Sequence, residues 1–128
     1  MKITTVETSQ LSGAALDWAV AKAVGLSVAE DCGHFVAEEG TIYLGRVGRA
    51  YSPSTNWSQG GPLIQEEQVE ICWQGIDGKA AFWIARHQDA HYNQSGDSPL
   101  IASCRAIVAA ELGDDVDVPA ELMEANNA

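Results

Sequence analysis

The stretch that decides the fold, residues 98–113, reads SPLIASCRAIVAAELG. Ser98 is a favourable N-cap, and Pro99 suits the first helical position because its missing N–H would have no partner there. Apolar side chains then recur at intervals of three and four, and Gly113 follows as a residue that ends helices easily. These apolar positions are Leu100, Ile101, Cys104, Ile107, Val108 and Leu112. We therefore predict a helix from about Pro99 to Leu112 that packs on the core.

A second segment with helical periodicity lies near the N-terminus, from about Ser12 to Val24, and Gly25 follows it. Its apolar stripe and flank comprise Leu11, Ala15, Leu16, Trp18, Ala19, Val20 and Ala23. Asp17 and Lys22 fall outside this stripe, so we expect them to point away from it. The sequence thus predicts two main helices.

Strand-like patterns separate the two helices. Val69, Ile71 and Trp73 alternate with polar residues, residues 75–78 (GIDG) have turn chemistry, and residues 80–85 form a second apolar run. This pattern predicts a hairpin, and residues 41–47 form a weaker strand candidate. A short last helix is expected from Pro119 to Met123. The order indicates an α+β fold in which two main helices pack on a small antiparallel sheet, with a long irregular loop.

Length and composition indicate a single domain over residues 1–128, with a flexible C-terminal tail from about residue 124. The chain has 46% hydrophobic residues, a composition that favours a globular core over disorder. No apolar run reaches the roughly 18 residues of a membrane span, and the N-terminus lacks a signal-peptide pattern. The three cysteines form no Cys-x-x-Cys pair, which favours reduced thiols. We expect a soluble cytoplasmic protein.

The formal net charge of -11 argues against direct binding to nucleic acids or to anionic membranes. The acid is concentrated in three stretches, residues 30–39, 66–70 and 111–124, which carry charges of -4, -3 and -6. The remainder of the chain is slightly positive. We therefore expect acidic surfaces that favour basic partners.

The most unusual segment, residues 51–64, reads YSPSTNWSQGGPLI. It could be an ordered loop pinned by Tyr51 and Trp57, in which hydroxyl and amide side chains bond the backbone. Alternatively, if Pro62 begins a short helix through Glu67, the free N–H groups of Leu63 and Ile64 would suit an anion.

Local charge is compatible with the anion hypothesis, because no carboxylate occurs between Glu39 and Glu66. One or both of Asp17 and Arg105 are expected to contact the loop, either as part of a binding site or through an ordinary salt bridge. The candidate ligand-binding residues are Arg46, Arg49, Tyr51, Ser52, Ser54, Thr55, Asn56, Trp57, Gly60, Gly61, Asp17 and Arg105.

No complete catalytic or metal-binding set is visible. His87 and His91 are four residues apart, but two ligands are too few and residues 86–96 read as a polar loop, so these histidines are expected to be solvated or locally bonded. Cys32 and His34 have no second ligand pair, and no serine lies in a Gly-x-Ser-x-Gly turn. We predict no metal and no cofactor, and the catalytic residues of any enzyme activity are unknown.

The string of residues 51–62 resembles the NinX-like family of bacteriophage and prophage proteins. Residues 15–20 (ALDWAV), 99–102 (PLIA) with Arg105, and 112–119 (LGDDVDVP) fit the same pattern, so the resemblance spans about residues 9–123. Asn56 stands where the family pattern has an acidic residue, which weakens any scheme that needs a carboxylate there. The family has no established function, and the resemblance implies a phage or prophage protein in the bacterial host cytoplasm.

Two functional hypotheses follow. The first is an accessory protein, not an enzyme, that binds a host or phage protein through its acidic surfaces. The second is a binding protein or enzyme for a small anion or nucleotide, with its site at residues 51–62.

Overall fold

The computed structural model describes residues 2–26, 34–36, 42–44, 49–75, 82–90 and 92–126. Its strands are β1 (Ile3–Glu7), β2 (His34–Val36), β3 (Ile42–Leu44), β4 (Arg49–Tyr51), β5 (Glu70–Gln74), β6 (Phe82–Arg86), β7 (Gln94–Gly96) and β8 (Asp115–Pro119). Its helices are α1 (Gly13–Ala23), α2 (Trp57–Glu67), α3 (Pro99–Leu112) and α4 (Ala120–Asn126), with a short 3-10 helix η1 at Thr8–Gln10. The predicted α+β class is confirmed.

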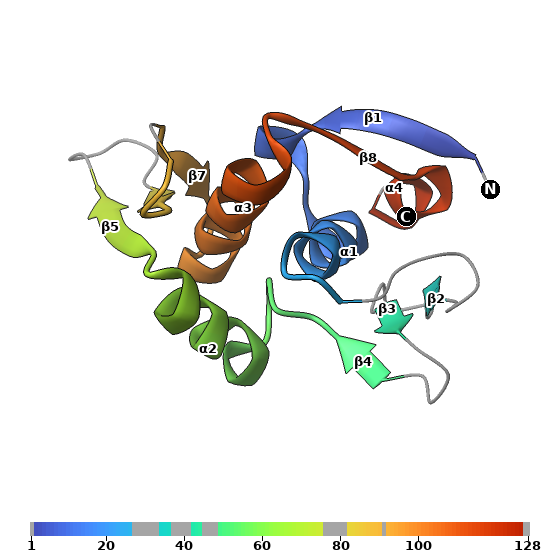
Figure 1. The fold of residues 1–128 in the computed structure, drawn as a ribbon, viewed down its shortest axis with the longest axis horizontal. Coiled ribbons are helices and arrows are strands. Elements are labelled where there is room, and N and C mark those ends of the chain that lie inside the picture. Colours follow the sequence, from blue (N-terminus) through green and yellow to red (C-terminus); the bar gives the residue numbers. More distant parts are fainter. Residues whose placement is uncertain are drawn as a thin grey trace.

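Helices α1 and α3 form the centre of the molecule, with β1 and β8 above them and α2 below (Figure 1). Helix α3 has the predicted bounds, and the hydroxyl of Ser98 accepts a hydrogen bond from the Ile101 N–H at 3.1 Å. Helix α1 is buried at every position from Ala14 to Ala21. The expectation that Asp17 points away from the core is therefore wrong, because small residues let neighbouring elements cover the helix on all sides.

Within the described residues, the strands form three small antiparallel sheets rather than one, in the orders β1–β8, β2–β3–β4 and β5–β6–β7. The predicted hairpin is confirmed as β5 and β6, with Trp73 opposite Trp83, and residues 76–78 of its turn lie outside the described residues. Strand β7 occupies part of the segment expected to be a polar loop. This sheet packs on α3 through Ala85, Ala102 and Ala106.

Strands β1 and β8 pair antiparallel, and β8 buries Val116 and Val118 against the core. Helix α4 starts after Pro119 and continues past Met123 to Asn126. Of the weaker strand expected at residues 41–47, the structure describes β3, and residues 45–47 lie outside the described part. None of the described helices has the length and apolar character needed to cross a membrane.

Candidate functional site

The segment expected to be an irregular loop is largely helical. A turn at residues 52–56 has its Asn56 N–H bonded to the Ser52 C=O at 2.8 Å, and α2 starts at the next residue. The Asn56 side chain caps α2 by accepting from the Ser58 N–H at 2.9 Å. The Gln59 side chain reaches back to accept from the Ser52 N–H at 2.6 Å. The polar side chains of this segment thus organise a helix start, and only the turn before it is irregular.

The geometry on which the anion hypothesis depended is absent. Pro62 lies inside α2 rather than at its start, so Leu63 and Ile64 belong to the helix interior and not to a free N-terminus. Gly60 is buried, and a Cβ atom there would lie 2.5 Å from the Pro53 carbonyl oxygen. The glycine therefore allows α2 to approach the turn before it closely.

Asp17 does contact this segment, as expected. Its Oδ1 accepts a hydrogen bond from the Ser54 N–H at 2.9 Å, and only 3% of Asp17 is exposed. Burial raises the pKa of the Asp17 carboxyl from 3.8 to about 6, although hydrogen bonds from Ser54 act in the opposite direction. Burial and the charge of Asp17 also raise the pKa of the Cys104 thiol. Cys104 is therefore an inert core thiol and no nucleophile.

Of the two residues, one or both of which were expected to contact residues 51–62, Asp17 does so, whereas Arg105 bonds to other segments. Its Nε donates to the Leu11 C=O at 2.8 Å, and its Nη1 donates to the Ser95 C=O at 2.7 Å. The guanidinium thus links the segment before α1 to β7, and neither of these two bonds reaches residues 51–62. Burial lowers the pKa of Arg105, and the charge of Asp97 opposes that shift.

The remaining candidate residues are spread over several environments. Tyr51 packs against the main core, whereas Thr55 and Trp57 are exposed. Arg46 and the side chain of Arg49 lie outside the described part of the chain. Ligand binding by these residues stays a prediction.

The burial of His87 and its contact with Glu67 were not predicted, because Glu67 is 20 residues away in the sequence. His87 is 1% exposed, and its Nε2 lies 3.2 Å from Glu67 Oε1. With Glu111 these residues bring three possible ligand atoms within 4.8 Å of one another. His87 is therefore locally bonded rather than solvated, and His91 lies outside the described residues.

The hydrogen bonds of His87 determine what this group can hold. The Asp89 N–H donates to His87 Nδ1 at 3.0 Å, so Nδ1 is an acceptor and the ring proton resides on Nε2. A metal would need the Nε2 lone pair and a proton on Nδ1. The arrangement therefore fits an Nε2–H donor to Glu67, which ties β6 to the end of α2, and does not fit a metal ligand.

Two neighbouring cavities that the described residues line lie at another place, where β1 ends and β8 begins. One cavity of about 450 Å³ is lined by Glu7, Thr8, Ser9, Tyr92, Gln94, Asp114 and Asp115. A second, of about 260 Å³, shares Tyr92, Gln94 and Asp114 with it and adds Asp89. We call these two cavities together the acidic groove.

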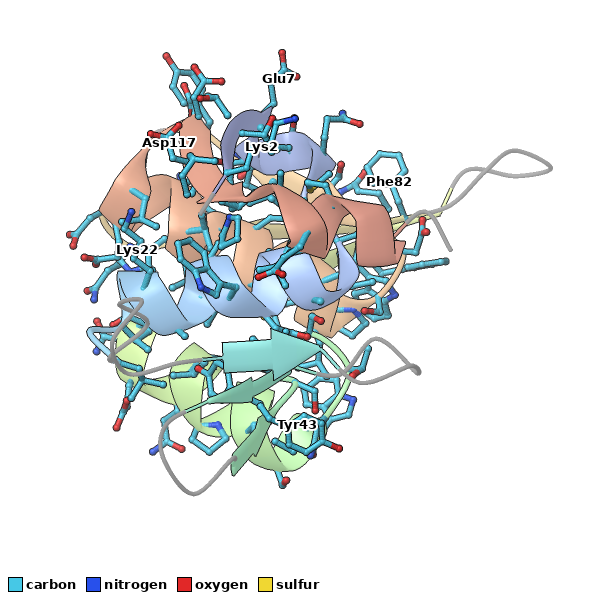
Figure 2. The ribbon with its side chains drawn as sticks, turned by 90° about the vertical axis from the view of Figure 1, so that its right-hand side faces the viewer. Lys2, Glu7, Lys22, Tyr43, Phe82 and Asp117 are labelled. Atoms are coloured by element: carbon cyan, nitrogen blue, oxygen red, sulfur yellow. The ribbon has the colours of Figure 1, made fainter. Side chains whose placement is uncertain are left out.

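The acidic groove combines carboxylates with an aromatic ring. Glu7 lies opposite Asp115 in the strand register, and both are exposed. Tyr92 is 72% exposed, and no lysine or arginine is among the described residues that line the groove. Figure 2 shows Glu7, Asp117 and Lys2 at the same end of the molecule. The chemistry of the groove suits a cationic group.

Comparison with protein families gives one result. The family model described as "Bacteriophage P22, NinX" matches residues 7–111, a span that includes α1, α2 and all of α3 except its last residue. No curated protein matches the chain.

Proposed function

The chain belongs to the bacteriophage P22 NinX family, and we propose that it is a phage-associated binding protein whose acidic groove receives a basic segment of a host or phage protein. The observation that carries this proposal is the groove itself, in which Glu7, Asp89, Asp114 and Asp115 surround an exposed tyrosine. We also propose that the protein acts in the cytoplasm of the bacterial host.

The physical support is electrostatic. Carboxylates that line a concave surface focus a negative potential, which attracts cations and speeds association with a basic partner. The face of the Tyr92 ring adds a cation–π surface for an arginine or lysine side chain. The same potential repels phosphate groups, so the proposed partner is a protein and not a nucleic acid.

We do not extend the proposal to a small anion or nucleotide at residues 51–62. Leu63 and Ile64 lie within α2, and Asp17 and Ser54 are buried against each other. No observation favours a reaction at this segment.

Affinity capture from bacterial lysate with matched baits tests the proposal. We expect the wild-type protein to retain a basic protein that salt elutes, and Glu7→Gln/Asp115→Asn to retain much less of it. The control variant Glu66→Gln/Glu70→Gln has the same net charge as Glu7→Gln/Asp115→Asn but alters exposed acids of α2 and β5, so it should retain the partner. Equal losses from both variants, or no salt-sensitive partner of the wild type, would contradict the proposal.

A further inference from the structure

We propose that the basic partner binds as an extended strand added to the outer edge of β1, next to the acidic groove. This inference rests on the proposed function and specifies how the partner is held. Its evidence is the orientation of the main-chain N–H and C=O groups of β1.

The hydrogen-bonding register of β1 defines which groups face outward. The Lys2 C=O accepts from the Ala120 N–H at 2.9 Å, and the Thr8 N–H donates to the Asp114 C=O at 2.7 Å. Both pairs continue the register of β1 and β8, in which Thr4 faces Val118 and Val6 faces Val116. Hydrogen-bonded pairs alternate in an antiparallel ladder, so the even-numbered residues of β1 bond to β8.

The odd-numbered residues therefore direct their main-chain groups away from β8. These groups are the N–H of Ile3, Thr5 and Glu7 and the C=O of Ile3 and Thr5, and none has a partner among the described residues. Figure 1 shows β1 at the outside of the fold, with β8 between it and α1. A free edge of this kind is a template for another strand.

The side chains beside this edge select the occupant. Glu7, Asp115 and Asp117 are exposed on one face of the two-stranded sheet, and Thr5 Oγ1 donates to Asp117 on the same face. Antiparallel pairing of β1 with β1 of a second copy would bring two such acidic faces side by side. If this pairing were centred on Thr5, Ile3 of each copy would lie opposite Glu7 of the other. Like charges oppose that pairing, whereas a basic strand is attracted.

The register also defines a recognition pattern. An antiparallel partner would place successive same-face residues opposite Glu7, Thr5 and Ile3. A cation suits the position opposite Glu7, and a second cation opposite Thr5 can reach past it towards Asp117. An apolar residue suits the position opposite Ile3, which is 50% exposed. The expected pattern is cation–x–cation–x–apolar. Because Glu7 and Asp115 also line the acidic groove, the first cation lies at its entrance.

A defined peptide tests this inference. The probe is Thr-Lys-Thr-Lys-Thr-Val-Thr-amide with an uncharged fluorophore on its N-terminus, titrated at low ionic strength and followed by fluorescence anisotropy and by amide hydrogen exchange. We expect exchange at Ile3, Thr5 and Glu7 to slow about tenfold or more in the complex, because these amides gain partners. Thr4 and Val6 serve as internal controls, since their amides are already bonded to β8.

Two changes remove backbone hydrogen bonds between the peptide and β1 without changing the charge of either molecule. Methylation of the backbone nitrogens of the two lysines and the valine removes the N–H donors of the peptide. Thr5→Pro removes an outward N–H of β1 that the fold does not use. Each should weaken binding about tenfold or more, consistent with loss of one or more backbone hydrogen bonds. The N-methylated peptide keeps the test valid even if Thr5→Pro disturbs β1.

The outcomes separate the two proposals. Unchanged affinity of the N-methylated peptide, with weaker binding by Glu7→Gln/Asp115→Asn, would overturn strand addition and leave the acidic groove as the binding site. Unchanged affinity of Glu7→Gln/Asp115→Asn would overturn the proposed function. Self-association of the wild type that Thr5→Pro abolishes would show that a second copy, rather than a basic partner, occupies the edge.

Discussion

Gly60 and Gly61 are adjacent in α2 but face different surroundings. A Cβ atom at Gly60 would lie 2.5 Å from the Pro53 carbonyl oxygen and 2.6 Å from Leu100 Cδ2, whereas one at Gly61 would meet nothing within 4 Å. Packing therefore requires glycine at position 60, because moving the backbone of Pro53 aside would cost free energy. Gly61 lowers the helix propensity of α2, and its lack of a Cβ atom avoids a conflict with the ring of Pro62, the next residue.

This contrast predicts unequal effects of the same substitution. Gly60→Ala should lower the free energy of unfolding by about 1–3 kcal/mol, the usual range for overpacking. Gly61→Ala should change it by less than about 1 kcal/mol, because the helix preference of alanine is offset by the conflict of its Cβ with the ring of Pro62. Urea unfolding of both variants measures the difference, and equal effects would show that α2 does not approach the turn at residues 52–56 so closely.

Asp17 makes the stability of the protein depend on pH in an unusual direction. Because burial raises its pKa to about 6, the folded state binds a proton more readily than the unfolded state does. The contribution of Asp17 to stability is therefore present at about pH 4 and is lost as the pH rises to about 6. A surface carboxylate with a lowered pKa would act in the opposite direction.

Replacement of Asp17 by asparagine tests this effect. Asp17→Asn keeps an oxygen that accepts from the Ser54 N–H but removes the buried charge, so the variant should be more stable than the wild type at pH 7 by up to about 3 kcal/mol. The gain should shrink towards pH 4. Thermal unfolding across this range measures it, with Glu66→Gln as an exposed control, and a gain independent of pH would be inconsistent with the raised pKa.

At the scale of elements, local sequence information predicted α1, α3 and the β5–β6 hairpin. Ser98, Pro99 and Gly113 define α3 within a few residues of its ends. Helix α2 was missed because Pro62 and two glycines argue against a helix interior, and the contact of Gly60 with Pro53 is a tertiary feature. Strands β1 and β8 were missed because they are separated by most of the chain.

The candidate site was predictable to a similar extent. The acidic stretch at residues 111–124 and the contact of Asp17 with residues 51–62 both follow from sequence patterns. The groove does not, because Glu7, Asp89 and Asp114 come from distant segments that only the fold brings together. Arg105 has backbone partners 10 and 94 residues away, and no local pattern indicates them.

Arg105 connects the segment before α1 to β7. Arg105→Ala should lower the free energy of unfolding by about 2–4 kcal/mol, because it leaves the carbonyl groups of Leu11 and Ser95 without a charged donor. Arg105→Lys should recover only part of this loss, since one ammonium cannot reproduce both bonds. Urea denaturation measures both variants.

Arg86 provides the comparison for this prediction. Its guanidinium lies 3.6 Å from the Glu70 carboxylate, and both side chains are largely exposed. Removal of such a pair costs less than about 1 kcal/mol, so Arg86→Ala should change stability little. If the two alanine variants lost the same stability, the bonds of Arg105 would have no special role in linking the elements.

For the whole molecule, the uneven charge distribution opposes folding at one end. Glu7 and Asp115 are direct cross-strand neighbours with like charges, and Asp114 and Asp117 lie beside them in the sequence. Like charges in this arrangement destabilise a sheet. A protein under no other constraint would gain stability by replacing one of them, whereas a surface that binds a basic partner needs the same carboxylates.

Stability and binding should therefore change in opposite directions at this end of the molecule. At low salt, Glu7→Gln should raise the free energy of unfolding by on the order of 0.5 kcal/mol, and with it slightly the melting temperature, and should weaken binding of the basic peptide. Added salt should reduce both effects, because it screens the repulsion between Glu7 and Asp115 and the attraction to the partner alike. Paired thermal unfolding and anisotropy titrations at two salt concentrations measure this coupling. A variant that lost stability together with binding would mean that Glu7 supports the β1–β8 pair instead, and the acidic groove would then need no functional explanation.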